Sequence, residues 1–498
     1  MAMKKQRRSM SILIIALVVV LSACAPARLT QKGKSSAVRA LRQRLEAILA
    51  DSALGRAQAG VRIVSMRTGE VLFERNSHLL FHPASNQKLL TSAVAISLLG
   101  PQFIYKTTVA CDSGAVRDSV LSGPVYLIGR GNPDLTTGDL FTLAQALARR
   151  GLREIQGNIV CDDFYFDQIR WAAGWMWDDD PSWLYSRFTA LTVNDNAATL
   201  TVRPAQMPGR PALVAINVPG PLAEVVNRSF TVARAALIDS LELEPLAVQR
   251  RWQENQNVFE IDGTMSMEEP LRTAKQNVLQ AELLAGYVFR DLLSLCGIRF
   301  AGSIQHGLGP SKPEILAEHH GALLPVLVNL NKTSDNLTAE LLLKTIGAER
   351  FGRPGTAEKG LRALREFLGK CGVDTLALRA ADGSGVSRYN LVTPAGLVNL
   401  LSAMWNNAGI RREFAATLPL AGVDGTLETR MRQTPAGGVL RAKTGSLSGV
   451  STLSGYTTTI AGEPLVFAMM MQHYLVSDRA VRRMQDRIGA EISGFTRE

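Results

Sequence analysis

The stretch FHPASNQKLLTSAVAISLLG, residues 81–100, places Ser85 three positions before Lys88 and ahead of an apolar run that is typical of a helix. A spacing of three brings two side chains onto one helix face, about one turn apart. A serine nucleophile needs a neighbouring base, and a neutral lysine can serve. However, a chain of this length contains about one Ser-x-x-Lys by chance, and Ser85 also suits a helix N-cap. The motif alone does not separate a catalytic pair from a capping serine beside a solvated lysine.

Two further motifs follow along the chain. Ser334-Asp335-Asn336 precedes another apolar helix, and Lys443-Thr444-Gly445 lies in a strand-like run near the C-terminus. Taken singly, the first is ordinary helix-start chemistry and the second is compatible with a turn. Ser-x-x-Lys, Ser-Asp-Asn and Lys-Thr-Gly in this order are the signature of penicillin-binding proteins and class A β-lactamases. Their joint occurrence favours a serine acyl-transfer site.

The resemblance narrows to one family. In compact β-lactamases the first two motifs lie much closer together, whereas 249 residues separate Ser85 from Ser334 here. This layout resembles the D-alanyl-D-alanine carboxypeptidase/endopeptidase family (class C low-molecular-mass penicillin-binding proteins, peptidase family S13), whose members carry extra domains between these motifs. Four stretches are similar to that family: PASNQK (83–88), ADGSGVSRYNLVTP (381–394), LPLAGVDGTL (418–427) and AKTGSLSGV (442–450).

The resemblance implies a role for each catalytic residue. Ser85 would attack the carbonyl of the penultimate D-alanine in a peptidoglycan stem peptide, and Lys88 would take its proton. Lys88 must then be neutral near pH 7, which burial and a second cation, Lys443, both favour. Ser334 would relay the proton to the leaving amine, and Asn336 would bind the substrate peptide.

The resemblance also implies the substrate-binding groups. Lys443 and Thr444 would hold the terminal carboxylate of the substrate beside Gly445, and the backbone N–H groups of Ser85 and Ser446 would form the oxyanion hole. Stem peptides and β-lactam antibiotics are thus the expected partners. No metal or other cofactor is needed. The adjacent His319-His320 is expected to be a solvated loop rather than a ligand pair.

Asp162 and Asp163 are candidates within the region between the first two motifs. They follow a strand-like run, and an acid there would meet the amino group of a diaminopimelate side chain. The alternative is an ordinary surface aspartate. We carry Asp162 forward as a predicted substrate-binding residue.

Element patterns predict a mixed α/β (α+β) fold of the penicillin-binding-protein/β-lactamase type, in which helices flank a sheet. A hairpin is expected over 61–76, around Gly69. Short alternating strands dominate residues 101–276, interrupted by one helix at about 139–150. We therefore assign residues 36–100 and 277–498 to the catalytic domain and residues 101–276 to a large inserted β-rich lobe.

The N-terminal residues are typical of an export signal. A basic segment precedes an apolar run from Ile12 to Leu21, too short to span a bilayer, and the segment ends in LSAC. This ending resembles the lipobox of bacterial lipoproteins, which predicts a signal peptide over 1–23, lipidation of Cys24 and a polar tether over 24–35. The expected location is the periplasm, with a lipid anchor in the outer membrane if the cell is Gram-negative. A plain secretory signal is the alternative.

Charge and cysteine content add two constraints. Without residues 1–23, 51 Lys and Arg remain against 44 Asp and Glu, and the net charge falls from +11 to about +7. This excess forms no basic block, which argues against nucleic-acid binding. The remaining cysteines are widely spaced, which excludes zinc and thiol-redox motifs. Cys111 and Cys161 are candidates for a disulfide, and free thiols are the alternative.

Two other functions remain open at this stage. A β-lactamase would share the fold but would need rapid deacylation. A non-catalytic wall-binding lipoprotein is expected to have lost a motif residue, and none is missing here.

Overall fold

A computed structural model describes residues 25–180, 182–233 and 243–498. Its central sheet joins the two ends of the chain. The antiparallel strand order is β2-β1-β22-β21-β20, with β1 (Gln58–Ser65), β2 (Val71–Arg75), β20 (Arg441–Leu447), β21 (Val450–Thr458) and β22 (Pro464–Gln472). The predicted hairpin is present as β1 and β2, and Gly69 in its turn has a φ of 75°. β20, which carries the Lys-Thr-Gly motif, is an edge strand.

Strand β22 explains why the sheet has helices on both faces. Its sequence PLVFAMMMQ is an almost unbroken apolar run, and alternate side chains of a strand point to opposite faces. Phe467, Met469 and Met471 belong to one hydrophobic cluster, whereas Val466 and Met470 belong to another. A sheet with two apolar faces must be covered on both sides.

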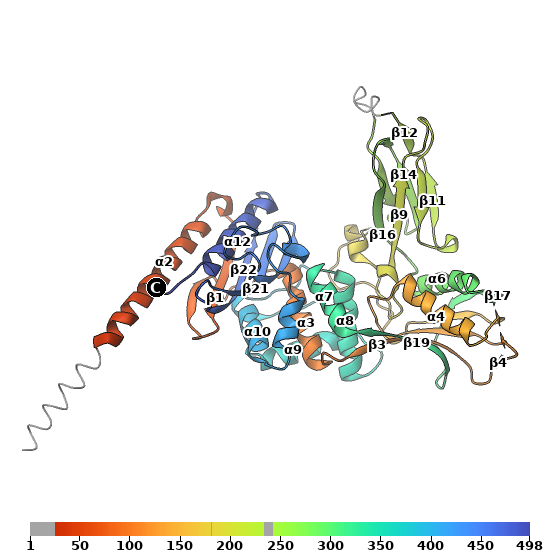
Figure 1. Ribbon diagram of the computed structural model, residues 1–498, viewed down its shortest axis with the longest axis horizontal. Coiled ribbons are helices and arrows are strands. Elements are labelled where there is room, and N and C mark those ends of the chain that lie inside the picture. Colours follow the sequence, from red (N-terminus) through yellow and green to blue (C-terminus); the bar gives the residue numbers. More distant parts are fainter. Residues whose placement is uncertain (1–24, 181, 234–242) are drawn as a thin grey trace, which may run out of the picture.

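Each cluster is completed by its own helical layer (Figure 1). On one face α2 (Ala25–Leu49) and α12 (Asp478–Ser493) pack side by side. The other layer comprises α3 (Gln87–Leu98), α7 (Leu323–Lys332), α8 (Asn336–Phe351), α9 (Ala357–Lys370), α10 (Pro394–Asn406) and α11 (Arg411–Thr417). Residues 87–96 of α3 are all buried, which places this helix inside its layer.

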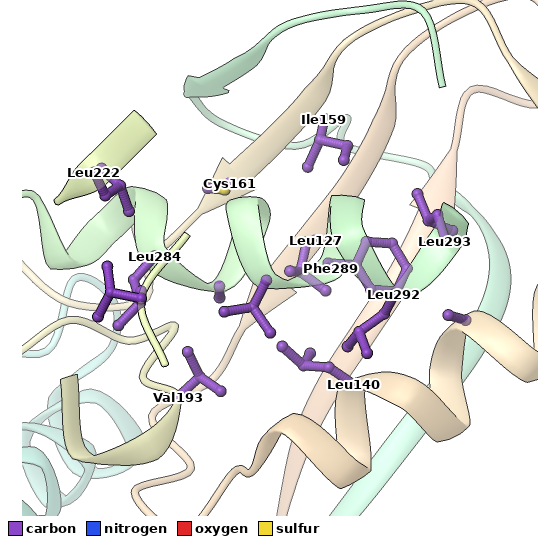
Figure 2. Packing of buried hydrophobic residues seen from close by; sticks show 14 of the residues in the cluster. Leu127, Leu140, Ile159, Cys161, Val193, Leu222, Leu284, Phe289, Leu292 and Leu293 are labelled. Carbon is purple, nitrogen blue, oxygen red and sulfur yellow. The ribbon is translucent and has the colours of Figure 1, made fainter. Parts of the chain in front are cut away.

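The region between α3 and α7 forms a separate lobe (Figure 1). Its main sheet has the order β18-β8-β6-β3-β19, built from β3 (Ile104–Cys111), β6 (Val125–Gly129), β8 (Ile159–Asp162), β18 (Ile304–His306) and β19 (Glu314–Ala322). Helices α4 (Thr137–Arg149) and α6 (Ala281–Leu295) bury their apolar faces with this sheet. Figure 2 shows Phe289 and Leu292 of α6 beside Leu127 and Leu140.

Shorter strands complete the lobe. A four-stranded sheet has the order β17-β7-β5-β4, and an upright module holds the sheets β10-β9-β16, β11-β14-β13 and β12-β15. Their bounds are β4 (Val116–Arg117), β5 (Val120–Leu121), β7 (Glu154–Ile155), β9 (Ala197–Arg203), β10 (Leu213–Ile216), β11 (Glu224–Asn227), β12 (Phe230–Val232), β13 (Ala247–Arg250), β14 (Val258–Asp262), β15 (Thr264–Ser266), β16 (Arg272–Asn277) and β17 (Arg299–Phe300).

The lobe is longer than the sequence pattern indicated. The predicted boundary lay at 276/277, yet β18 pairs with β8 and β19 pairs with β3. Helix α6 also packs in the core of the lobe. The lobe therefore extends over residues 101–322, and the chain returns to the catalytic domain at α7. The sequence changes from strands to a helix near residue 277, but this change is not a domain boundary. Strands that follow the helix in the sequence pair with strands that precede it.

One other expectation on local structure also needs correction, and the structure decides between two alternatives left open for the cysteines. The predicted tether over 24–35 is helical from Ala25, because α2 begins there; Pro26 is tolerated in the first turn of a helix. Cys111 and Cys161 are free thiols, since β6 separates their strands β3 and β8. The predicted signal peptide and Cys24 lie outside the described residues. Among the described helices, none is both long and apolar enough to cross a membrane.

Candidate active site

Ser85 lies in a short 3-10 turn, η2 (Ala84–Asn86), that leads into α3. Ala84, immediately before it, has a φ of 46°, a left-handed conformation that costs an L-residue free energy and that occurs most often at functional sites. The first N–H groups of a helix have no partner within the helix. The turn thus leaves Ser85 partly exposed at the N-terminal end of α3, while the next N–H, that of Asn86, donates to the carbonyl of Pro83.

Lys88 is completely buried directly beneath Ser85. Its Nζ lies 3.0 Å from Ser85 Oγ, 2.7 Å from Asn336 Oδ1 and 2.8 Å from the carbonyl oxygen of Ser384. Burial lowers the pKa of Lys88 to about 8, against opposing effects from Asp335 and other nearby carboxylates. About a tenth of the lysine is therefore neutral at pH 7, within hydrogen-bond distance of the serine hydroxyl.

The Ser-Asp-Asn motif lies at the junction of α7 and α8, where each residue has a different position. Ser334 has a φ of 66° and lines the pocket beside Ser85. Asp335 is the N-cap of α8, since its carboxylate accepts from the N–H groups of Leu337 and Thr338. Asn336 accepts from Lys88 and donates from Nδ2 to the carbonyl of Leu184, at 2.9 Å. The amide orientation of Asn336 is thus fixed from two sides.

Strand β20 brings the third motif to the same place. Lys443 is completely buried, and burial together with the charge of Lys88 holds its pKa well below the usual range. The like-charge effect that the sequence suggested between the two lysines thus lowers the pKa of Lys443. Gly445 lies so close to the nucleophile that an added Cβ would be 2.8 Å from Ser85 N. Only glycine permits this approach.

These segments surround a pocket of about 350 Å³. Five residues singled out from the sequence line it: Ser85, Ser334, Thr444, Gly445 and Ser446. Five residues with no signal in the sequence also line it: Thr426, Arg430, Ser451, Thr452 and Arg482. The two arginines add positive charge to the pocket wall, where Arg482 donates to Ser446 Oγ at 3.2 Å and Arg430 pairs with Asp486 at 2.7 Å. In the sequence, nothing distinguished them from the other basic residues.

Two buried acids, which no sequence motif indicated, support the surroundings of Lys88. Asp382 accepts from Gly385 N at 2.8 Å and from Trp175 Nε1 at 3.1 Å. Glu340, on α8, accepts from the N–H groups of Gly383 and Ser384. Burial and the charge of Asp382 raise the pKa of Glu340. Together the acids fix the glycine-rich turn whose Ser384 carbonyl contacts Lys88.

Asp162 and the adjacent His319-His320 lie apart from this pocket. Asp162 is buried at the end of β8, where its carboxylate accepts from Phe164 N and Gly309 N, and it does not line the pocket of Ser85. These two backbone contacts are those of a residue that stabilises the conformation of the chain around it. His319 and His320 lie on β19 rather than in a loop, and they contact different acids, Asp139 and Glu318. Adjacent strand residues point to opposite faces, so they form no ligand pair.

A sheet between two helical layers, with these three motifs meeting at one edge strand, defines the class of penicillin-binding proteins and serine β-lactamases. The family follows from comparison with known proteins. Residues 41–492 match the D-Ala-D-Ala carboxypeptidase 3 (S13) family. The chain belongs to this family and is a hydrolase of the D-alanyl-D-alanine carboxypeptidase type.

Individual relatives align with this chain over most of their length. The chain is 36% identical over 474 residues to the D-alanyl-D-alanine carboxypeptidase of Actinomadura sp. strain R39, covering 91% of this chain and 85% of that protein. It is 28% identical to D-alanyl-D-alanine carboxypeptidase DacB of Haemophilus influenzae, covering 83% and 85%. The crystal structure of penicillin binding protein 4 (dacB) from the same organism superposes with a TM-score of 0.75 at 26% identity, covering 92% and 99% of the two chains.

Proposed function

We propose that this enzyme hydrolyses the D-Ala-D-Ala bond of peptidoglycan stem peptides through a covalent acyl-enzyme on Ser85. The observation that carries the proposal is the contact of 3.0 Å between Lys88 Nζ and Ser85 Oγ. Neutral Lys88 accepts the hydroxyl proton while Oγ forms a bond to the carbonyl carbon. The leaving amine then takes a proton through Ser334, and water hydrolyses the ester to free the enzyme.

The proposed oxyanion hole consists of the N–H groups of Ser85 and Ser446. The close approach of β20 at Gly445 supports this arrangement, since it brings the edge strand against Ser85. Backbone donors fixed in advance stabilise the developing oxyanion, by about 3 kcal/mol for one donor. The terminal carboxylate of the substrate would be held by Lys443 and Thr444, in the positive field of Arg430 and Arg482.

The same chemistry predicts covalent reaction with β-lactams and a choice of leaving group. A crystal structure of the Haemophilus influenzae protein is described as a complex with a β-lactam, and we infer that penicillin acylates Ser85 here. Free D-alanine would leave in the carboxypeptidase reaction and a cross-linked neighbouring peptide in the endopeptidase reaction. We further propose that the enzyme is exported and anchored through lipid on Cys24.

The contacts of Glu340 favour a peptidase over a β-lactamase. A class A β-lactamase uses a glutamate to activate the deacylating water. Both oxygens of Glu340, a buried acid close to this site, accept from backbone N–H groups. A slowly hydrolysed penicilloyl adduct is therefore expected.

Incubation of the purified enzyme with a stem pentapeptide and with cross-linked muropeptides, followed by chromatography of the products, tests the proposal. Release of D-alanine by wild type but not by Ser85→Ala supports it. Rapid multiple turnover of penicillin would instead identify a β-lactamase. Failure both to release D-alanine and to retain fluorescent penicillin would identify a non-catalytic wall-binding protein.

A further inference from the structure

The inserted lobe (residues 101–322) contains a cavity of about 780 Å³ that shares no lining residue with the pocket of Ser85. This volume is in the range of ligand-binding pockets, about 300–1,000 Å³. The cavity lies where four parts of the lobe meet. Its lining comes from Gln168, Arg170, Trp171 and Arg187, from residues 220–224 and 255–258, and from Leu279, Gln280 and Glu282.

Amide side chains supply uncommitted hydrogen-bonding groups in this cavity. Asn255, Gln256 and Gln280 line it with exposed side chains, and none of the three side chains is hydrogen-bonded to another part of the described chain. Each amide offers two N–H donors and a carbonyl acceptor. A ligand that combines many donors and acceptors in a small space would satisfy them.

The charges that line the cavity cancel. Arg170 and Arg187 are offset by Glu224 and Glu282. Arg170 already pairs with Glu282 at 3.5 Å, and Arg187 pairs with Asp180 at 3.1 Å. Such a lining does not select a polyanion or a strongly charged peptide. It suits an uncharged polar molecule.

The rest of the lining supplies surfaces for C–H groups. The guanidinium of Arg187 lies over the ring of Trp171, 4.1 Å from the ring centroid. This stacking keeps the two planar groups against each other. Leu222, Val258 and Leu279 add small apolar areas. Sugar rings carry hydroxyl and acetamido groups at their rim and C–H groups on their faces. The free amides of the cavity can hydrogen-bond the first, and the apolar and aromatic side chains can pack against the second.

We propose that this cavity binds a saccharide, specifically an N-acetylhexosamine segment of the glycan strand that carries the stem peptides. The choice of this saccharide rests on the proposed function. The cavity would hold the polymeric part of the substrate while the peptide reaches Ser85.

One chain segment connects the two sites and supports this assignment. Gln168 and Arg170 near its start and Arg187 at its end line the cavity. Between them, Trp175 donates to Asp382 and Leu184 accepts from Asn336, both beside the catalytic centre. A glycan in the cavity would therefore lie against the segment that borders the catalytic pocket.

The test is calorimetric titration of the full-length enzyme with tetra-N-acetylchitotetraose. The double variant Gln256→Ala/Gln280→Gly removes two amides; glycine at 280 adopts the observed φ of 58° without strain. We expect wild type to bind, the double variant to bind about tenfold more weakly, and Gln102→Ala, an exposed amide outside the cavity, to bind as wild type does. All three proteins should hydrolyse a free pentapeptide equally, because the cavity is separate from the catalytic groups.

Lack of binding by wild type, or equal binding by the double variant at an unchanged melting temperature, would overturn the assignment. D-alanine release from intact peptidoglycan adds a second readout, and here the double variant should be slower than wild type. Failure of the proposed function would appear separately, as wild-type enzyme that leaves the free pentapeptide intact whatever the titration shows.

Discussion

Gly445 of β20 lies against the main-chain nitrogen of Ser85 with no room for a side chain between them. A Cβ at position 445 would be 2.8 Å from Ser85 N and 2.2 Å from Thr452 Oγ1. The hydroxyl of Thr452 also donates to the carbonyl of Pro83 at 2.9 Å. The nucleophile turn is therefore held to the sheet by the close approach of β20 and by two hydrogen bonds of Thr452 on β21, one to Pro83 and one from Asn86.

Gly445→Ala is expected to push β20 away from Ser85. A displacement of about 1 Å in a reacting group lowers rates by about 10²-fold, so acylation by a fluorescent penicillin should slow by roughly that factor. Gly123→Ala is the matched control, because its Cβ would meet its nearest neighbour at 3.8 Å. Acylation of Gly445→Ala at the wild-type rate would contradict the close approach.

The pH dependence of the acylation rate should reflect the pKa of Lys88. Only the neutral amine accepts the proton of Ser85, and burial lowers the pKa of Lys88 to about 8. The rate constant for penicillin acylation is therefore expected to rise with pH and to level off above about 8. Lys88→Arg keeps the charge but does not deprotonate, so its rate should be low at every pH while its melting temperature stays near that of wild type. A rate that falls through this range would rule out a lysine base.

Asn336→Asp tests the electrostatics of the same contact. It would place a carboxylate 2.7 Å from Lys88 Nζ and stabilise the charged amine, which raises the pKa of Lys88. Each unit of increase lowers the neutral fraction at pH 7 about tenfold. The acylation profile should move to higher pH, and rates of the variant and wild type should converge in alkaline buffer. A profile that keeps its midpoint would show that Asn336 does not sense the charge of Lys88.

Glu340 is expected to be a positioning residue for the turn at Ser384. Glu340→Ala leaves the buried N–H groups of Gly383 and Ser384 without acceptors, at a cost of about 1–3 kcal/mol each. Glu340→Gln keeps one acceptor oxygen and should lose much less. Urea unfolding measures both free energies, and the acylation rate should fall in the same order. Equal stability of the two variants would contradict this role.

The three motifs that meet at the pocket could be located in the sequence because each is a short segment whose chemistry is local. Ser85 and Lys88 share one helix turn, and Lys443 to Ser446 occupy one strand. The supporting role of the acids Glu340 and Asp382 was not predictable. Their hydrogen-bond partners come partly from distant segments, and no sequence motif with a characteristic spacing indicates these contacts. The same holds for Leu184, whose carbonyl orients Asn336 across the boundary between lobe and domain.

The organisation of the chain was predictable only in outline. The inserted lobe between the first two motifs is present, but its end was placed too early, since β19 pairs with β3 across about 200 residues. The pairing of Cys111 and Cys161 stayed open in the sequence for a related reason. Strand-like runs indicate that Cys111 and Cys161 lie in strands but not which strands are neighbours.

The central claim is that Ser85 is the residue that becomes acylated. Intact-protein mass spectrometry after incubation with benzylpenicillin, followed by peptide mapping, tests it most directly. The account predicts one penicilloyl group on the peptide that contains Ser85 and no mass gain for Ser85→Ala. A penicilloyl group on Ser85→Ala, or one that maps to the peptide of Ser334 in wild type, would contradict it.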